Sequence, residues 1–369
     1  MSAAPDPIRR SIEVEYWVID SEGRLTTPGD LVDVAPGAER EFVEPLLEIK
    51  TSPCETHDEL RRELQERISA VLRRADDLNK GLVPLATPLA VDEIADRPGE
   101  RTHIQAQTIG PPFEYVRHCA GTHIHFEQQP GSVCDQFNTL VALDPALALV
   151  NSARHFRGEA VAAGARSKCY RRLAYADLDY QGQLWPYLTD RTEWDRRLDA
   201  RYEEFIDAAR RVGIDRSTVA DCFEPESAVW TPVKLREEFG TVEWRAPDTT
   251  LPSQILRLAE TMATIIEAVP HCDVRIEGTT GRITQEAITL PTFETVSTYV
   301  DDAIEHGIDS RAVNTYLTRM GFDPTGYDPL SDAFADTGEL SSATARQRRL
   351  AYADRLRSDV LERRSLEAD

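Results

Sequence analysis

Lysine is almost absent from this 369-residue chain, which has four lysines among its 42 basic residues. The 64 acidic residues leave a formal net charge of −22 at pH 7. Because so acidic a surface repels phosphate groups, nucleic-acid partners are disfavoured. An acid-rich, lysine-poor composition suggests a cell interior with very high salt, where the screening length falls to about 3 Å at 1 M. We therefore predict a halophilic protein whose acidic residues solvate its whole surface.

The chain also lacks paired cysteines and long apolar runs. Its six cysteines are scattered without a CxxC pair, which argues against a zinc ribbon or a disulfide framework and predicts free thiols in a reducing compartment. The first ten residues, MSAAPDPIRR, have no apolar core of signal-peptide length. No run of about 18 apolar residues occurs. These absences predict a cytoplasmic protein that does not span a membrane.

A glycine-rich Walker loop is missing as well. The one Lys-Gly pair, Lys80–Gly81, lacks the surrounding pattern of such a loop. The chain therefore offers no phosphate-binding loop of this type.

Segments with helical periodicity alternate irregularly with segments that resemble strands. Thr56 and Glu59 form a capping box that opens the clearest helix. We predict further helices at about 192–212, 253–269, 293–306, 310–320 and 342–365. We predict strands at 12–20, 42–52, 122–126 and 241–246, and a weaker one at 82–85. The order lacks a strict βαβ rhythm, which favours an α+β fold with a mostly antiparallel sheet, polar on one face and covered by helices on the other.

Four of the predicted strands place ionisable residues together on one face, because residues two apart in a strand share a face. The pairs are Glu13 with Glu15, Glu44 with Glu48, His123 with His125, and Glu243 with Arg245. The ordinary explanation is a half-solvated sheet. A solvent face would, however, carry Asp, Arg, Thr and Ser freely, whereas these positions repeat Glu and paired His. Like charges two residues apart need a cation nearby, and a hard divalent ion such as Mg²⁺ accepts carboxylate oxygens and substrate phosphates.

At these residues the chain resembles the second type of glutamate–cysteine ligase, a family of carboxylate–amine ligases with a glutamine-synthetase-like catalytic fold. The segments SIEVEYWVID, VEPLLEIKTSPC, GTHIHFE and GTVEWRAPDT are similar to four motifs of that family in order and spacing. They run from Ser11 to Thr249, about two-thirds of the chain. The resemblance implies a catalytic domain over residues 1–285 and a helical C-terminal part over 286–369, packed on the same domain.

The resemblance also implies the chemistry. In the family, ATP phosphorylates the γ-carboxylate of glutamate, and the amine of cysteine attacks the acyl phosphate. Magnesium, or manganese in its place, would be held by six residues, which are Glu13, Glu15, Glu44, Glu48, His125 and Glu243. His123 and Arg245 would lie against the nucleotide, and Arg166, in GARSKCYRRL, against a phosphate or a substrate carboxylate. Glu48, Arg245 and Arg166 would serve catalysis. The implied partners are small-molecule substrates, and a homo-oligomer is a family-level expectation.

Two other interpretations stay open. A His-x-His strand with distant carboxylates can also bind zinc, as in a metal-dependent amide hydrolase, although the excess of Glu over His favours a harder metal. A non-catalytic relative that binds nucleotide or glutamate as a sensor would keep the same residues without turnover.

Overall fold

The computed structural model describes residues 7–175, 177–178 and 180–366, with side chains up to residue 361. Residues 1–6 lie outside this part. They belong to the ten-residue segment MSAAPDPIRR, in which the sequence showed no signal-peptide core. The strands are β1 (Arg10–Asp20), β2 (Ala38–Arg40), β3 (Leu46–Lys50), β4 (Lys80–Val83), β5 (Thr122–Glu127), β6 (His155–Phe156), β7 (Glu159–Ala160), β8 (Val233–Arg236), β9 (Thr241–Trp244), β10 (Asp273–Ile276), β11 (Arg282–Ile283) and β12 (Ala287–Leu290).

The α-helices are α1 (His57–Asp77), α2 (Glu100–Ile109), α3 (Phe113–Arg117), α4 (Val133–Leu143), α5 (Ala165–Lys168), α6 (Arg191–Arg211), α7 (Arg216–Cys222), α8 (Pro225–Ala228), α9 (Pro252–Ala268), α10 (Phe293–His306), α11 (Arg311–Arg319) and α12 (Ser342–Leu366). The shorter helices that matter below are the 3₁₀ helix η2 (Asp144–Val150) and the π-helix η3 (Cys169–Leu173). The capping box of Thr56 and Glu59 is present at the start of α1, as predicted.

The main sheet is antiparallel throughout. Within the described residues it has seven strands, in the order β2-β3-β1-β5-β9-β8, with β4 paired to β1 outside this path. The fold is α+β, as predicted. The predicted strands at 12–20, 122–126, 241–246 and 82–85 correspond to β1, β5, β9 and β4. The strands β2, β6–β8 and β10–β12, each of two to four residues, were not predicted.

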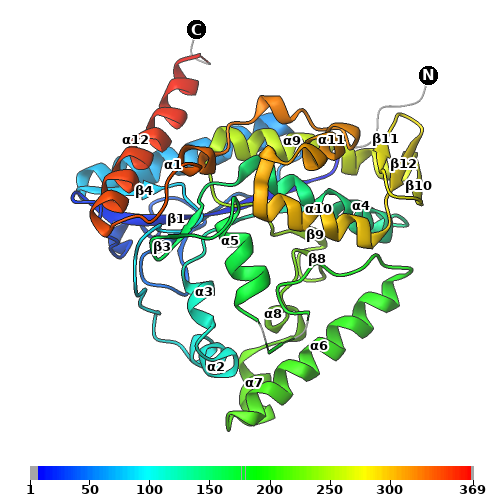
Figure 1. Cartoon of the computed structure of the whole chain (residues 1–369), viewed down its shortest axis with the longest axis horizontal. Helices are drawn as coiled ribbons and strands as arrows, with labels where there is room; N and C mark the ends of the chain where they lie inside the picture. Colours follow the sequence, from blue (N-terminus) through cyan, green and yellow to red (C-terminus); the bar gives the residue numbers. More distant parts are fainter. Residues whose placement is uncertain (1–6, 176, 179, 367–369) are drawn as a thin grey trace.

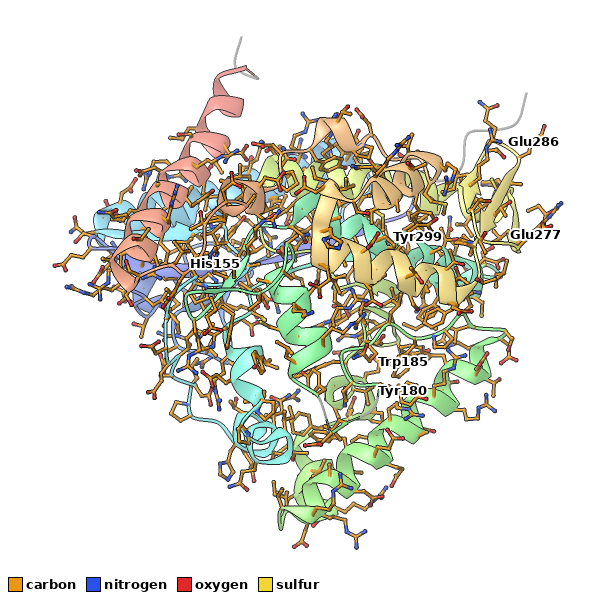
Figure 2. The ribbon with its side chains drawn as sticks, in the orientation of Figure 1. His155, Tyr180, Trp185, Glu277, Glu286 and Tyr299 are labelled. Carbon is orange, nitrogen blue, oxygen red and sulfur yellow. The ribbon has the colours of Figure 1, made fainter. Side chains whose placement is uncertain are left out.

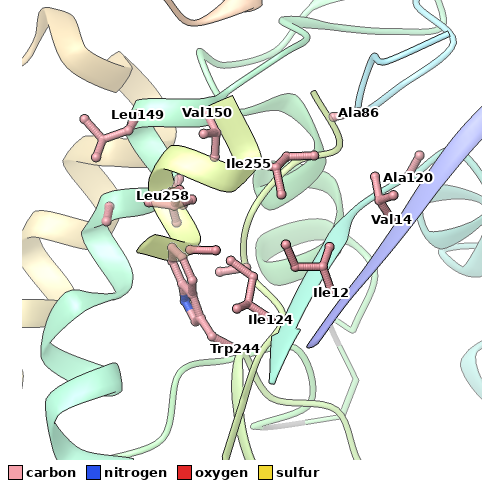
Figure 3. Packing of buried hydrophobic residues seen from close by; sticks show 14 of the residues in the cluster. Ile12, Val14, Ala86, Ala120, Ile124, Leu149, Val150, Trp244, Ile255 and Leu258 are labelled. Carbon is pink, nitrogen blue, oxygen red and sulfur yellow. The ribbon is translucent and has the colours of Figure 1, made fainter. Parts of the chain in front are cut away.

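Helices cover one face of this sheet, and the hydrophobic core lies between them. Ile12, Ile124 and Trp244 are fully buried on that face. Figure 3 shows their side chains directed toward Ile255 of α9 and Val150 of η2. The alternation in β1, β5 and β9 therefore leaves the opposite face polar, as the sequence predicted.

A second group of helices lies on the other side of the sheet. Helices α2, α3, α6, α7 and α8 form the lower part of the molecule in Figure 1. They have a separate hydrophobic cluster that includes Phe113, Phe205 and Val219. Beside α6, Tyr180 and Trp185 lie close together (Figure 2), and the Trp185 indole N–H donates to the Tyr180 carbonyl at 3.0 Å. Helices and loops therefore cover the polar face of the sheet.

The C-terminal helices share the main core. Val300 of α10, Tyr316 of α11 and Leu356 of α12 are all buried in it. Strand β12 pairs with β10 and β11 at the end of the molecule marked by Glu277 and Glu286 in Figure 2. A boundary at residue 285 would cut this small sheet, so the division into 1–285 and 286–369 stays a prediction.

By length and composition alone, one helical stretch could cross a membrane. The search of the sequence for an uninterrupted apolar run did not find it. The stretch is Val133–Val150, formed by α4 and η2, with a mean hydropathy of 1.2. Because 83% of this stretch is buried inside the fold, it serves as a core element beside the sheet. Among the described residues no second stretch of this kind occurs.

Candidate active site

The register of the antiparallel strands brings the predicted residues into adjacent positions on the polar face. Glu13 of β1 lies opposite both Lys50 of β3 and His123 of β5. Glu15 lies opposite Glu48 in the same strand pair. His125 lies opposite Glu243 of β9. Cross-strand partners on one face have Cβ atoms only about 5 Å apart, so four distant stretches of chain converge on one surface.

The first group of potential metal ligands consists of Glu13, His125 and Glu243, whose ligand atoms all lie within 4.8 Å of one another. His125 Nε2 is 3.7 Å from Glu13 Oε1 and 3.6 Å from Glu243 Oε1. The other ring nitrogen, Nδ1, is 3.1 Å from the Thr241 hydroxyl, which fixes the orientation of the ring. Nε2 itself is buried without a hydrogen-bond partner. A buried imidazole nitrogen aimed between two carboxylates is what a metal site requires.

The second group shares Glu13 and adds Glu48 and His123. His123 Nδ1 is 3.0 Å from Glu13 Oε2. Burial raises the pKa of Glu13, but its contacts with His123 and His125 outweigh burial and hold that pKa below its usual range. Burial, together with the charge of Arg245, lowers the pKa of His123 to about 4, so its imidazole is neutral and free to act as a ligand at neutral pH.

The third group is purely carboxylate and consists of Glu15, Glu41 and Glu48. Burial and the neighbouring Glu48 raise the pKa of Glu15 to about 7. Burial and Glu15 raise the pKa of Glu41 to about 7, and burial with Glu41 and Glu13 raises that of Glu48. The Lys50 ammonium, 2.8 Å from Glu48 Oε2, compensates only part of this charge. Three crowded carboxylates are the arrangement that a hard divalent cation stabilises.

Glu44 does not join these groups, which corrects the sequence prediction. The predicted strand 42–52 begins only at Leu46, and residues 42–45 form a bridge and a turn. The two-residue alternation from Glu48 therefore does not extend to Glu44. Its backbone N–H donates to the Ala95 carbonyl at 2.8 Å, and the residue lines a different pocket. The same turn brings Glu41, which sequence reasoning missed, into the carboxylate group.

This pair of glutamates provides a direct test of the third group. We expect Glu41→Gln to weaken Mg²⁺ affinity about 10-fold or more, because a coordinating charge is lost. Glu44→Gln should leave the affinity within about 2-fold of the unchanged protein. Calorimetric titration of both variants with Mg²⁺ gives the comparison. The opposite ranking would restore the sequence prediction.

Two arginines flank Glu243 at the β8–β9 side of the site. Arg245 NH1 is 2.5 Å from Glu243 Oε1, and Arg236 NH1 is 3.0 Å from Glu243 Oε2. Burial raises the pKa of Glu243, but Arg245 and the two imidazoles hold it below its usual range. Glu243 is therefore a carboxylate at neutral pH. Sequence reasoning missed Arg236. The available signal was that Lys234 and Arg236 are two residues apart in β8 and therefore share a face.

Arg166 lies beside the backbone that follows β9. It lies in α5, is 7% exposed, and donates to the carbonyls of Ala246 and Arg245 at 3.0 and 3.1 Å. Its guanidinium lies against Gly121, where a Cβ would come within 2.7 Å of Arg166 Nε. Because Gly121 has no side chain, the guanidinium can approach β5 closely. Arg166 Nε is buried without a hydrogen-bond partner, so one strong donor is left for a ligand.

A second buried guanidinium lies next to it and was missed from sequence. Arg171, in the π-helix η3, is 3% exposed and forms an ion pair with Asp144 at 2.6 Å. Its Nε and one terminal nitrogen have no partners. π-Helical turns often occur at functional sites. The sequence signal was the cluster of arginines in GARSKCYRRL, from which Arg166 alone was selected.

These groups surround one cavity of about 320 Å³. Glu13, Glu15, Glu41 and Glu48 line it, as do His123, Arg166, Arg236 and Arg245 and the aromatic residues Phe42, Tyr170, Trp230 and Phe239. His125 and Glu243 lie behind this lining and are buried. Trp230 packs against Tyr170 and Tyr175 with ring centroids 5.6 Å apart and also forms part of the cavity wall.

No protein-family model and no curated protein matches the sequence, whereas solved structures match its fold. The bifunctional glutathione synthetase from Pasteurella multocida aligns with 97% of this chain at 14% identity and a TM-score of 0.53. The chain has a carboxylate–amine ligase-like fold. The alignment covers 53% of that synthetase, so the chain spans about half its length.

The glutamate–cysteine ligase from Francisella tularensis, solved in complex with AMP, has a TM-score of 0.49 at 12% identity. That alignment covers 96% of this chain and 78% of the ligase. At 14% identity, the similarity to the Pasteurella synthetase shows the fold alone and leaves the substrates to be argued from the site.

Proposed function

We propose that this protein is an ATP- and Mg²⁺-dependent carboxylate–amine ligase that forms a γ-glutamyl-type amide through an acyl phosphate, in the manner of a glutamate–cysteine ligase. The observation that carries the proposal is the convergence of three overlapping carboxylate and imidazole groups on one sheet face, with arginines lining the same cavity. The ligase-like fold and the four sequence motifs support it. The overall reaction transfers a phosphoryl group to a carboxylate oxygen, after which an amine nitrogen displaces phosphate.

The residues fit divalent cations. The first group offers the unpartnered His125 Nε2, and the third brings three carboxylates together without enough positive charge. Glu13, Glu15, Glu41, Glu48, Glu243 and the two histidines would hold the ions. When bound, Mg²⁺ would neutralise triphosphate charge and polarise the transferred phosphoryl group.

The arginines complete the positive half of the site. Arg245 and Arg236 are fixed by Glu243 next to the first group, where they would contact nucleotide phosphates. Arg166 lines the same cavity and has an unpartnered Nε, where it would bind a substrate carboxylate or the transferred phosphate. Fixed charges of this kind stabilise a transition state without reorganisation.

The distribution of the histidines speaks against the zinc hydrolase. A catalytic zinc site with two histidines and a carboxylate needs both imidazoles on one ion. Here His123 and His125 belong to different groups, each with two carboxylates. Oxygen-rich groups favour a harder metal than zinc.

The proposal is tested by a phosphate-release screen of amino acids and amines with ATP and Mg²⁺ at high salt. We expect ADP and phosphate in equal amounts only when a carboxylate donor and an amine acceptor are both present, with glutamate and cysteine the first pair to test. Mass spectrometry of the product should show the new amide. A sensor would bind nucleotide in the same assay without producing ADP.

Metal replacement distinguishes the ligase from the hydrolase. After removal of metals with a chelator, we expect turnover to be lost and to return with Mg²⁺ or Mn²⁺ but not with Zn²⁺ alone. The measurement is ADP formation for each metal. Amide hydrolysis restored by zinc without ATP consumption would support the hydrolase instead.

A further inference from the structure

An exposed aromatic ring stands beside the first metal-ligand group. Phe239 lies in the turn between β8 and β9, is 53% exposed, and lines the active-site cavity. Most large apolar side chains of the described residues are buried, and leaving a phenyl ring in water sacrifices hydrophobic stabilisation. Because this ring lines the charged cavity as well as being open to solvent, a ligand bound in the cavity would cover part of its apolar surface.

The neighbours of Phe239 connect it to the charged groups. The Arg236 guanidinium carbon lies 4.7 Å from the centre of the ring, and the same guanidinium is held by Glu243 at 3.0 Å. The His125 ring meets the Phe239 ring edge-on at 6.1 Å. The ring is thus positioned by His125 of the first group and by Arg236, which Glu243 holds, while about half of its surface stays open.

We propose that Phe239 is the stacking platform for the base of the bound nucleotide. The inference rests on the proposed function and adds the orientation of the nucleotide in the cavity. The phosphates of the nucleotide lie at the group of Glu13, His125 and Glu243, and its base lies over the open part of the Phe239 ring. Arg236 stands between the phosphate position and the base position. A base provides a flat π-face, and stacking on an aromatic side chain contributes substantially to nucleotide affinity.

Another aromatic wall provides the alternative position. Tyr170 and Trp230 line the same cavity, and the Arg166 guanidinium carbon lies 5.7 Å from the centre of the Tyr170 ring. These rings already pack against each other and against Tyr175. Because Tyr170 stands beside Arg166, we assign this part of the cavity to the second substrate.

The test compares binding of ADP with binding of inorganic pyrophosphate, each with Mg²⁺ at high salt, by calorimetric titration. We expect Phe239→Ala to weaken ADP binding about 10-fold and to leave pyrophosphate within about 2-fold. Phe239→Trp should retain ADP affinity. Ile276→Ala, at a comparably exposed position (51%) on β10, is the control and should change neither.

Three results would overturn the inference. An unchanged ADP affinity in Phe239→Ala would show that the base does not contact the ring. Equal losses of ADP and pyrophosphate affinity would show that the ring affects only the binding of the phosphates. A loss of ADP affinity in Trp230→Leu but not in Phe239→Ala would place the base at the other wall. If the unchanged protein binds neither ligand, the proposed function itself fails.

Discussion

Replacing Glu48 by Gln should reduce kcat/KM about 10²- to 10³-fold or more, the largest effect that we expect from a single substitution. Glu48 belongs to two of the three ligand groups, so its charge contributes to two cation positions at once. Removing a single charge-stabilising group from an active site typically has an effect of this size. The amide is nearly isosteric, which leaves the fold of β3 intact.

Two measurements separate this effect from damage to the fold. We expect Mg²⁺ to raise the melting temperature of the unchanged protein and to lose most of this effect in Glu48→Gln. The matched control is Glu39→Gln. Glu39 also pairs with Lys50, at 3.2 Å, but lies outside the ligand groups, so its variant should keep activity within about 2-fold. Full activity in Glu48→Gln would remove the basis for a metal-dependent reaction at this face.

Gly121→Ala should reduce kcat/KM about 10²-fold although it leaves every predicted ligand in place. The added Cβ would collide with the guanidinium of Arg166, the flexible end of that side chain. Gly121 does not require a positive φ, so the backbone accepts alanine and the arginine is displaced instead. The loss would equal that of a missing fixed charge in the active site.

A double-mutant cycle tests whether the effect acts through Arg166. Gly121→Ala combined with Arg166→Ala should be no worse than Arg166→Ala alone. Gly338→Ala is the control, because no atom lies within 4 Å of the position where its Cβ would be. Additive losses, or wild-type activity in Gly121→Ala, would show that Arg166 is not positioned for the reaction as the structure implies.

The polar face of the sheet was predictable because alternation in a strand depends only on local geometry. β1, β5 and β9 are long enough for the two-residue period to identify Glu13, Glu15, His123, His125 and Glu243 as members of one face. The pattern also predicted that these residues meet on one surface. Strands that each have one polar and one apolar face can pair in a single sheet with all their polar faces on the same side. The register that pairs Glu13 with both Lys50 and His123 required the structure.

The errors occurred where the chain leaves regular structure. The turn before β3 reverses which side chains face the site, so Glu41 replaces Glu44 in the carboxylate group. Arg171 reaches the cavity from a π-helical turn, whose period no sequence pattern indicated. Phe239 lies in a hairpin turn between two four-residue strands. Such positions depend on tertiary contacts that local propensity does not contain.

The most direct test of the metal-binding face is a crystal structure with Mn²⁺ and a non-hydrolysable ATP analogue. We predict anomalous scattering peaks bounded by Glu13, His125 and Glu243 and by Glu15, Glu41 and Glu48, with the phosphates of the analogue above them on the polar face. A nucleotide bound elsewhere, with no manganese among these residues, would contradict the account.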